Sequence, residues 1–386
     1  MFMTDLFCAI LRGEPVVWPA GASERAAGLL ELARDQGVHL LIAQRLSQEG
    51  GSGDCPVNVR ALFTQAWRDE AAVEQIVRHE LREVIAALSA EGIRPLLFKG
   101  AALAFTHYPN PVLRPRVDND LLIGPQEVRL AGTALERIGY GRPPAVAGTL
   151  VSYQVPYSKT DRFGIQHALD LHWKIANPQI FADTLPVEYL AARAVPVPAL
   201  GEAAAALGSV DALAIACIHR VAHHGDEQRL IWLYDIHLLA GALTAAEAED
   251  FLSLAAAKRI RAVCARGCSL AHARFGTSFP TDLADRLAAG GAQDEPSAGH
   301  LRGGMRKVDV LLSDLGALDR WSDRWRLLQE HVFPPADYMQ QKYGVFTRAW
   351  LPLLYARRFV GGAGGWFQRK KGRQRDGRGD AGSVDE

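Results

Sequence analysis

The spacing of apolar positions changes along the 386-residue chain, and each change predicts a different kind of structure. Between Pro56 and Gly92 no other proline or glycine occurs, and apolar residues recur at intervals of three and four. This periodicity predicts one long amphipathic helix, begun by the proline and ended by the glycine. Shorter apolar runs at 26–33 and 38–46 extend the prediction to an N-terminal helical region over residues 1–91.

A strand-type pattern follows this helix. Short apolar or alternating runs bounded by proline and glycine predict strands, with two helical stretches among them. The predicted strands span 93–98, 117–123, 152–158 and 165–175, and the predicted helices span 99–108 and 126–138. Because strands and helices alternate within a short window, residues 92–197 predict a small mixed-sheet core of the α+β class, flanked by helical regions.

The last part of the chain turns rich in alanine and leucine, which predicts a C-terminal helical domain over residues 198–360. Within it, helical periodicity predicts segments at 202–224, 229–240, 245–274 and 312–331. We interpret four aromatic residues of this domain as core or domain-contact residues, namely Trp321, Trp325, Phe333 and Tyr343.

Composition narrows the class of protein without identifying a partner. The chain has 43 Lys plus Arg and 43 Asp plus Glu, so its net charge gives no reason to expect a general nucleic-acid binder. The charge is uneven, because residues 361–386 hold six basic and four acidic groups. They predict a disordered basic tail, for which a contact with nucleic acid or a membrane surface stays open.

The sequence also bears on location. No stretch approaches the roughly 18 uninterrupted apolar residues of a membrane span, and the first residues lack the basic start and long apolar run of a signal peptide. The five cysteines are scattered and odd in number, which fits reduced thiols better than a disulfide framework. These features predict a cytoplasmic protein.

The strongest chemical signal is the segment Asp118-Asn119-Asp120. Alternate side chains of a strand share a face, so Asp118 and Asp120 are expected to point the same way. Two carboxylates this close repel each other, and the pattern therefore predicts a cation between them. Carboxylate oxygens of this kind suit Mg²⁺ or Mn²⁺.

The later strand repeats this geometry, because Asp170, His172 and Lys174 alternate with apolar residues. If the two strands are neighbours, Asp170 joins the first two carboxylates in a cluster able to hold two divalent ions. That arrangement supports phosphoryl and nucleotidyl transfer. Taken alone, each segment is equally the polar side of a half-exposed strand.

The pair Lys99-Gly100 follows the first predicted strand. A glycine entering a helix lets backbone N–H groups and the positive helix end approach a phosphate, and the lysine ammonium adds a charge. The pair means little alone. Its place about twenty residues before the paired carboxylates favours a phosphate-binding role.

The predicted helical domain carries several histidines. His219 and His223 are four residues apart, a spacing able to chelate zinc, but the metalloprotease glutamate and an adjacent His-Asp pair are both missing. Two interpretations stay open. This region, with His223, Arg229 and Asp235, lines a cleft that faces the carboxylates; or Trp232 and the histidines pack two domains together, with Asp235 pairing Arg229 or His219.

Several of these segments together resemble a known family. The segments are Phe98-Lys99-Gly100, Tyr108-Pro109, Arg114, Asp118-Asn119-Asp120-Leu121-Leu122-Ile123 and Leu169-Asp170-Leu171-His172-Trp173. They are similar to an uncharacterised bacterial nucleotidyltransferase family related to the minimal nucleotidyltransferases of the polymerase-β superfamily. The likeness extends over residues 25–358. Lys99-Gly100 stands where better-studied nucleotidyltransferases have Gly-Ser, and Val117 where a serine often precedes the first aspartate.

The resemblance implies a nucleotidyltransferase fold and transfer of a nucleoside monophosphate from a nucleoside triphosphate to an unidentified acceptor, whether small molecule, peptide, protein or tRNA. It implies Mg²⁺, or Mn²⁺, held by Asp118, Asp120 and Asp170. Lys99, Gly100 and Arg114 would contact the nucleotide, and the cleft-lining candidates are His172, His223, Arg229 and Asp235. Two alternatives remain: a catalytically silent nucleotide-binding or scaffold protein on the same fold, and a toxin-like nucleotidyltransferase that modifies tRNA or protein.

Overall fold

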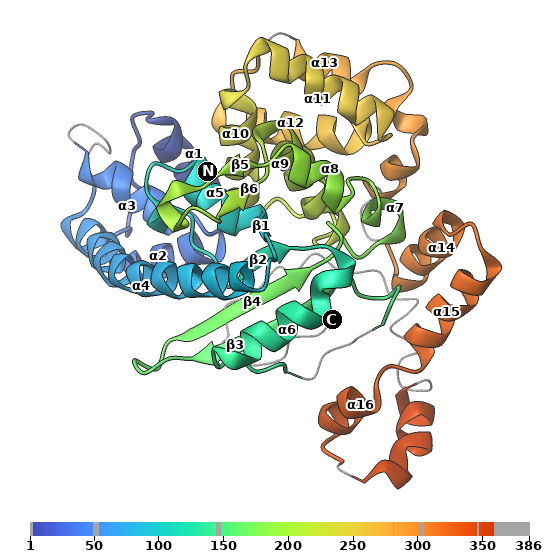
Figure 1. Ribbon diagram of the computed structural model, residues 1–386. Helices are drawn as coiled ribbons and strands as arrows, with labels where there is room; N and C mark the ends of the chain where they lie inside the picture. The colour runs from blue at the N-terminus through green and yellow to red at the C-terminus, as the bar shows by residue number, and fades with distance from the viewer. Residues whose placement is uncertain are drawn as a thin grey trace.

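One mixed sheet forms the centre of the molecule. The computed structural model describes residues 3–48, 54–143, 148–280, 282–301, 305–345 and 347–358. The strands are β1 (Leu96–Leu97), β2 (Asn119–Leu122), β3 (Gln154–Thr160), β4 (Gln166–His172), β5 (Val195–Pro196) and β6 (Ala205–Ala206). Their order in the sheet is β3-β4-β2-β1-β6-β5, and helices lie around it (Figure 1). The predicted α+β class with a mixed-sheet core is confirmed.

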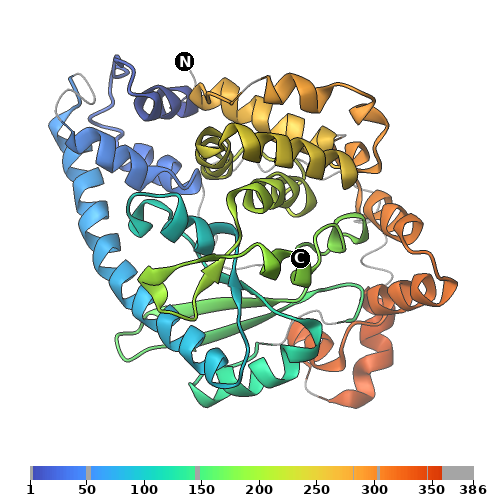
Figure 2. The ribbon, with the colours of Figure 1, turned by 45° about the horizontal axis from the view of Figure 1, so that its top comes forward.

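Four helices precede the sheet: α1 (Met3–Arg12), α2 (Ala26–Asp35), α3 (His39–Ser47) and α4 (Val57–Ala90). The last is the predicted long helix, and it begins directly after Pro56. It ends before Gly92, whose φ of +77° is a left-handed conformation that glycine adopts without steric cost. Figure 2 shows α4 along one edge of the molecule.

The two faces of the sheet belong to different cores. Leu97 and Leu121 pack in a cluster with the C-terminal half of α4 and with α6 (Val128–Arg137). Leu96 and Leu122 belong instead to a larger cluster, built with α1 to α3 and the later helices. Neighbouring residues of one strand face opposite ways, so a sheet of short strands can join both halves of the molecule.

The predicted helix over 202–224 is wrong in its first part. The helix found there, α9, spans Ser209–Ala222, and Ala205–Ala206 form β6 instead. Alanine favours a helix, but β6 pairs in parallel with β1, and that long-range pairing overrides local propensity. The sheet therefore extends past residue 197, where the core was expected to end.

The remaining helices before residue 302 are short or broken. They are α5 (Lys99–Thr106), α7 (Gln179–Ala182), α8 (Val187–Ala192), α10 (Leu230–Ala242), α11 (Ala245–Ala257), α12 (Arg261–Phe275) and α13 (Leu283–Ala288). The helix predicted at 245–274 is thus two helices, separated where Arg259 takes a φ of +55°. Short 3₁₀ turns lie at Pro111–Leu113, Pro125–Glu127, Pro198–Leu200, Ala292–Asp294, Pro296–Leu301 and Arg348–Trp350. All five cysteines are free thiols and buried.

A C-terminal arm completes the described chain, with α14 (Lys307–Ala317), α15 (Trp321–Val332), α16 (Ala336–Tyr343) and helical residues 351–358. The helix predicted at 312–331 is therefore split between α14 and α15. The Glu330 carboxylate holds the arm to the loop before β3, because it accepts hydrogen bonds from the backbone N–H groups of Thr149, Leu150 and Val151 at 2.9, 2.9 and 3.0 Å.

The interpretation of the arm's aromatic residues as core residues is wrong for three of them. Trp321 is 79% exposed, Trp325 68% and Phe333 59%. The two tryptophans are four residues apart, so they share one helical face, whereas the buried residue of α15 is Leu327 on another face. The prediction of a disordered tail over 361–386 lies outside the described residues. Within the described ranges, no helix is long and apolar enough to span a membrane.

Candidate active site

The two acidic segments of the sequence meet on adjacent strands. β2 and β4 are parallel neighbours, and their register sets Asp120 opposite Asp170 and Leu122 opposite His172. Both aspartates line a cleft with a volume of about 460 Å³. Asp118, the residue just before β2, lines the same cleft. The condition for a carboxylate cluster, that the two strands be neighbours, is met.

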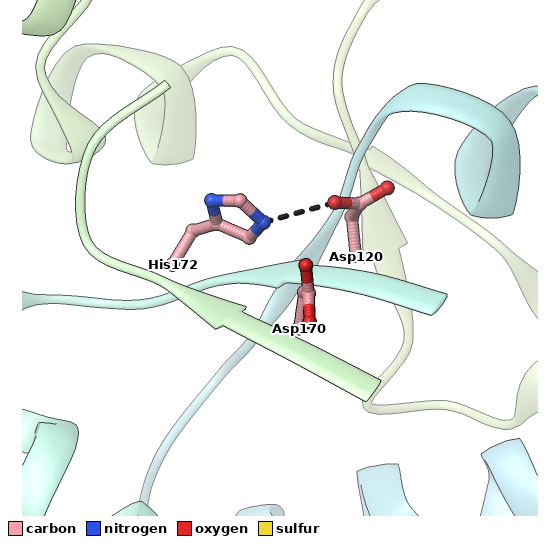
Figure 3. A group of neighbouring side chains, drawn as sticks. All are labelled: Asp120, Asp170 and His172. Carbon is pink, nitrogen blue, oxygen red and sulfur yellow. Dashed lines mark hydrogen bonds and ion pairs between the residues drawn. The ribbon is translucent and has the colours of Figure 1, made fainter. Parts of the chain in front are cut away.

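Asp120 lies at the centre of this arrangement (Figure 3). It is 6% exposed, and its Oδ1 accepts hydrogen bonds from Lys99 Nζ at 2.7 Å and from His172 Nε2 at 2.9 Å. Burial alone would raise the pKa of this carboxyl group, but the Lys99 charge and the His172 hydrogen bond hold the pKa below its usual range. Asp120 is therefore an ionised, fixed anion at neutral pH.

The neighbouring groups are shifted differently. Burial, aided by the Asp120 charge, raises the pKa of Asp118 from 3.8 to about 6. Burial and the Lys99 charge lower the pKa of His172 from 6.5 to about 4. His172 is therefore a neutral imidazole at pH 7, and Asp118 protonates before Asp120 as the pH falls.

Asp170 is held by a residue that the sequence analysis missed. Gln154, on β3, donates a hydrogen bond from Nε2 to Asp170 Oδ2 at 2.9 Å. The antiparallel pairing of β3 with β4 sets Gln154 opposite His172 and Pro156 opposite Asp170, so Gln154 lies on the same face of the sheet as His172 and Asp170. In the sequence Gln154 lies between Tyr153 and Val155, which are both buried in the structure. This alternation indicates a strand, but the neighbour of Gln154 follows only from the register of the β3–β4 hairpin.

Three side chains of the site fit a divalent ion. Among the described residues, Asp120, Asp170 and His172 form a group whose ligand atoms all lie within 4.8 Å of one another. Two carboxylates and an imidazole are ligands for Mn²⁺ and related ions, and carboxylates also serve Mg²⁺. The sequence predicted Asp118, Asp120 and Asp170 as the ligands; the group in the structure contains His172 in place of Asp118, which lines the cleft outside it.

Lys99 and Gly100 form the first turn of α5. Lys99 has a φ of +53°, a left-handed conformation that is uncommon for a residue with a side chain. Gly100 packs beneath the guanidinium of Arg114, and a Cβ atom at position 100 would lie 3.1 Å from both terminal nitrogens of that group. A larger residue at position 100 would therefore have to displace the Arg114 guanidinium by a few tenths of an ångström.

The Arg114 side chain is tied to the helical half of the molecule. Its Nε and Nη2 donate to the carboxylate of Asp235 on α10 at 2.8 Å each, and Nη1 donates to the Pro115 carbonyl at 2.7 Å. Tyr108 also donates its hydroxyl hydrogen to Asp235 at 2.7 Å. The expected pairing of Asp235 with Arg229 or His219 is therefore wrong, because the Asp235 carboxylate pairs bidentately with Arg114, whereas Arg229 donates its Nε hydrogen to the Asp35 carbonyl.

The opposite wall of the cleft comes from α9, α10 and the turn between them. It carries His219, His223, His224, Arg229 and Trp232. The His224 ring stacks on Trp232 with a centroid distance of 3.9 Å, and the Arg229 guanidinium lies 5.4 Å from the Trp232 ring centroid. These side chains line the same cleft as Asp118, Asp120 and Asp170, whereas His172, also predicted to line it, is buried and is not among its described lining residues.

Two ring nitrogens of this wall are buried without a hydrogen-bond partner among the described residues, His219 Nδ1 and His223 Nε2. Burial, with a contribution from Lys99, lowers the pKa of His223 to about 3 and that of His219 well below 6.5. Both rings are therefore neutral at pH 7. Buried polar atoms without a partner are uncommon in folded proteins.

Comparison with known proteins agrees with this geometry. No curated protein matches the sequence significantly. A sequence model of a family described as "Uncharacterised nucleotidyltransferase" matches residues 23–276, which is more than half of the chain. The matched region runs from α2 to α12 and includes both walls of the cleft. The chain belongs to this family of uncharacterised nucleotidyltransferases.

Proposed function

We propose that the protein transfers a nucleoside monophosphate from a nucleoside triphosphate to an acceptor, with a divalent metal ion as cofactor. The observation that carries this proposal is the register of β2 and β4, which sets Asp120 opposite Asp170 and brings His172 beside both. A buried pair of carboxylates in a cleft, next to a lysine, is suited to hold a metal and a polyphosphate. Family membership supports the same class of reaction.

In this reaction an acceptor oxygen attacks the α-phosphorus of the triphosphate. A new bond forms between that oxygen and phosphorus, the bond from the α-phosphorus to the bridging oxygen breaks, and pyrophosphate leaves with its electron pair. We assign Asp170 the acceptor's proton, because its carboxylate lies in the cleft and is oriented by Gln154. A bound divalent ion would supply Lewis-acid stabilisation of the phosphate charge.

The two walls of the cleft would each bind one part of the substrates. Asp120, Asp170 and His172 would hold the metal, with Asp118 beside them in the cleft, and Lys99 would supply positive charge beside the phosphates. Arg114 would act mainly by fixing the wall through Asp235. The opposite wall, with His223 and Arg229, would contact the acceptor or the nucleoside. Two of its ring nitrogens, His219 Nδ1 and His223 Nε2, make no hydrogen bond within the described residues.

The direct test uses the four nucleoside triphosphates labelled at the α-phosphate, with Mg²⁺ or Mn²⁺ and cell extract as the acceptor source. Wild-type protein is expected to release pyrophosphate and to label an acceptor. Asp118→Asn and Asp120→Asn are expected to abolish transfer, since a roughly 10³-fold loss is typical when a transition-state charge partner is removed. Asp183→Asn, an exposed aspartate paired with Lys174, is the matched control.

The outcomes separate the alternatives. Transfer that survives in both Asp118→Asn and Asp120→Asn would exclude this site. A wild-type protein that binds no metal–nucleotide complex by calorimetry would be the catalytically silent scaffold. Label that appears in the tRNA or protein fraction of the extract would identify a toxin-like enzyme, and label in small molecules would identify a tailoring enzyme.

A further inference from the structure

A cation of the chain itself lies among the strand carboxylates. Lys99 Nζ is 2.7 Å from Asp120 Oδ1, and its side chain is only 11% exposed. The ammonium also lies 4.8 Å from the centroid of the Phe98 ring, and that ring packs edge-on against His172 at 4.9 Å. A buried ammonium with a carboxylate and an aromatic ring beside it is strongly held, because moving either charge away would leave its partner uncompensated.

The backbone directs Lys99 to this place. Its φ of +53° is shared by few non-glycine residues of the described chain, the others being Asp226 and Arg259. A left-handed residue with a side chain persists where its surroundings fix it. Gly100 beneath the Arg114 guanidinium supplies such a fixed neighbour. Lys99 is therefore held in the site both by the turn that carries it and by its ion pair.

The charges of the site then allow one divalent ion. Asp118, Asp120 and Asp170 bring three negative charges to the cleft, and Lys99 cancels one. The two that remain are balanced by one ion of charge two. A second such ion would have to bind close to the ammonium on Asp120, where like charges repel in a site of low effective dielectric.

The donor set also selects among ions. His172 lies 2.9 Å from Asp120 Oδ1 and belongs with Asp120 and Asp170 to the group of side chains able to share an ion. Imidazole binds first-row transition ions well, whereas Mg²⁺ prefers oxygen ligands and retained water. A site with this imidazole favours Mn²⁺ over Mg²⁺.

We propose that the Lys99 ammonium takes the place of one of the two divalent ions that the strand carboxylates would otherwise hold. The site then binds a single divalent ion through Asp120, Asp170 and His172, with Mn²⁺ preferred to Mg²⁺. This proposal rests on the proposed function for its purpose, but its content is a metal stoichiometry that is measured without substrate.

The test measures Mn²⁺ binding to the full-length chain by equilibrium dialysis and by electron paramagnetic resonance, with Mn²⁺ alone and no substrate. Wild type is expected to bind one Mn²⁺ per chain and to show no exchange-coupled signal of a dinuclear site. Lys99→Met, which keeps length and removes charge, is expected to bind two Mn²⁺ and to show the coupled signal. Lys99→Arg keeps the charge and is expected to bind one.

His172→Gln tests the ligand set. We expect its Mn²⁺ affinity to fall about tenfold or more, while its Mg²⁺ affinity, measured by competition, changes less than about threefold. Two controls match these variants. Lys174→Met removes a lysine that pairs with Asp183, and His167→Gln removes another histidine of β4 that pairs with Asp161. Both are expected to bind Mn²⁺ as wild type does.

Two Mn²⁺ per wild-type chain, no Mn²⁺ at all, or a Lys99→Met protein that still binds one would each overturn the proposal. Equal loss of Mn²⁺ and Mg²⁺ affinity in His172→Gln would overturn the ligand assignment. If Lys99→Met failed to fold, the wild-type, Lys99→Arg and His172→Gln measurements would still decide. One bound Mn²⁺ without nucleotide transfer would refute the proposed function alone, and transfer with two bound ions would refute this proposal alone.

Discussion

The two walls of the cleft are built on opposite plans. On the sheet wall, Asp120 is bonded to Lys99 and His172, and Asp170 is bonded to Gln154. On the helical wall, ring nitrogens of His219 and His223 are buried without a partner among the described residues. On the sheet wall the side chains are bonded to one another, whereas the helical wall has ring nitrogens that make no hydrogen bond within the described residues.

This difference follows from the elements that carry the side chains. Adjacent parallel strands fix their side chains at regular spacing, so groups on β2 and β4 can satisfy one another. The helical wall is assembled from the end of α9, the turn after it and the start of α10, so its side chains do not follow the regular spacing of a strand. A wall of the first kind suits chemistry that requires fixed geometry, and a wall of the second kind suits recognition of a ligand.

The largest expected effect comes from removing the Arg114–Asp235 ion pair, which joins the two walls. Asp235→Ala leaves the buried Arg114 guanidinium, 8% exposed, without its carboxylate. We expect the free energy of unfolding to fall by about 3–5 kcal/mol, because an uncompensated buried charge is costly. Urea unfolding at pH 7 measures this. A double variant, Arg114→Met with Asp235→Leu, is expected to recover most of the loss.

The control for this prediction is Asp250→Ala, which removes an exposed aspartate paired with Arg193 and is expected to change stability by less than about 1 kcal/mol. If Asp235→Ala were no more harmful than Asp250→Ala, the two walls would not be joined through Arg114. The comparison would then concern two regions that fold independently.

A smaller effect is expected from pH, and it acts through the helical wall. The pKa of His223 is about 3 in the folded protein, against 6.5 for an ordinary histidine, because of burial and then Lys99. The neutral ring therefore contributes stability above pH 6.5, and this contribution is lost as the pH falls from 6.5 toward 3. His223→Asn is expected to reduce the loss of stability between pH 7 and pH 4 by about 1–3 kcal/mol.

Urea unfolding at pH 7, 5.5 and 4 checks this prediction, with His79→Asn as the control because His79 is exposed on α4. A His223→Asn protein that loses stability toward acid as steeply as wild type would show that the ring does not stay neutral in the fold. The helical wall would then carry charge and would repel, rather than accept, a cationic ligand.

The smallest effect is expected on the sheet wall, at a residue that orients another. Gln154→Leu removes the hydrogen bond to Asp170 and leaves the strand pairing in place. We expect transfer activity to fall about tenfold, equivalent to about 1.4 kcal/mol, with a higher Mn²⁺ concentration at half-maximal rate. Gln166→Leu, at the exposed start of β4, is the control. Unchanged metal dependence in Gln154→Leu would remove its positioning role.

The sequence carried most of the sheet wall. Alternation along the strands was enough to predict that Asp170 lies beside Asp120 if the two strands are neighbours. This worked because strand geometry is local and regular. Asp118, expected on the same strand, precedes β2 and lines the cleft outside this group. The Gln154 contact was not predicted, because it depends on the register that the turn at Asp161 to Ile165 gives to the β3–β4 hairpin.

The helical wall and its tie to the sheet were less accessible. The partner of Asp235 is Arg114, 121 residues away, and its identity depends on how α10 docks against the sheet. Spacing within a helix carries no information about such a contact. The same reason explains β6, since local propensity favoured a helix at Ala205 and its pairing with β1 and β5 makes it a strand.

The Glu330 carboxylate links the C-terminal arm to the loop at residues 149–151 and so to the strand that supports the site. That loop leads directly into β3, whose first residue is Gln154. A protein shortened before Glu330 would leave three backbone N–H groups without their acceptor just upstream of the side chain that orients Asp170. We therefore expect a chain that ends before Glu330 to hold Gln154 less firmly, although no described residue of the arm lines the cleft.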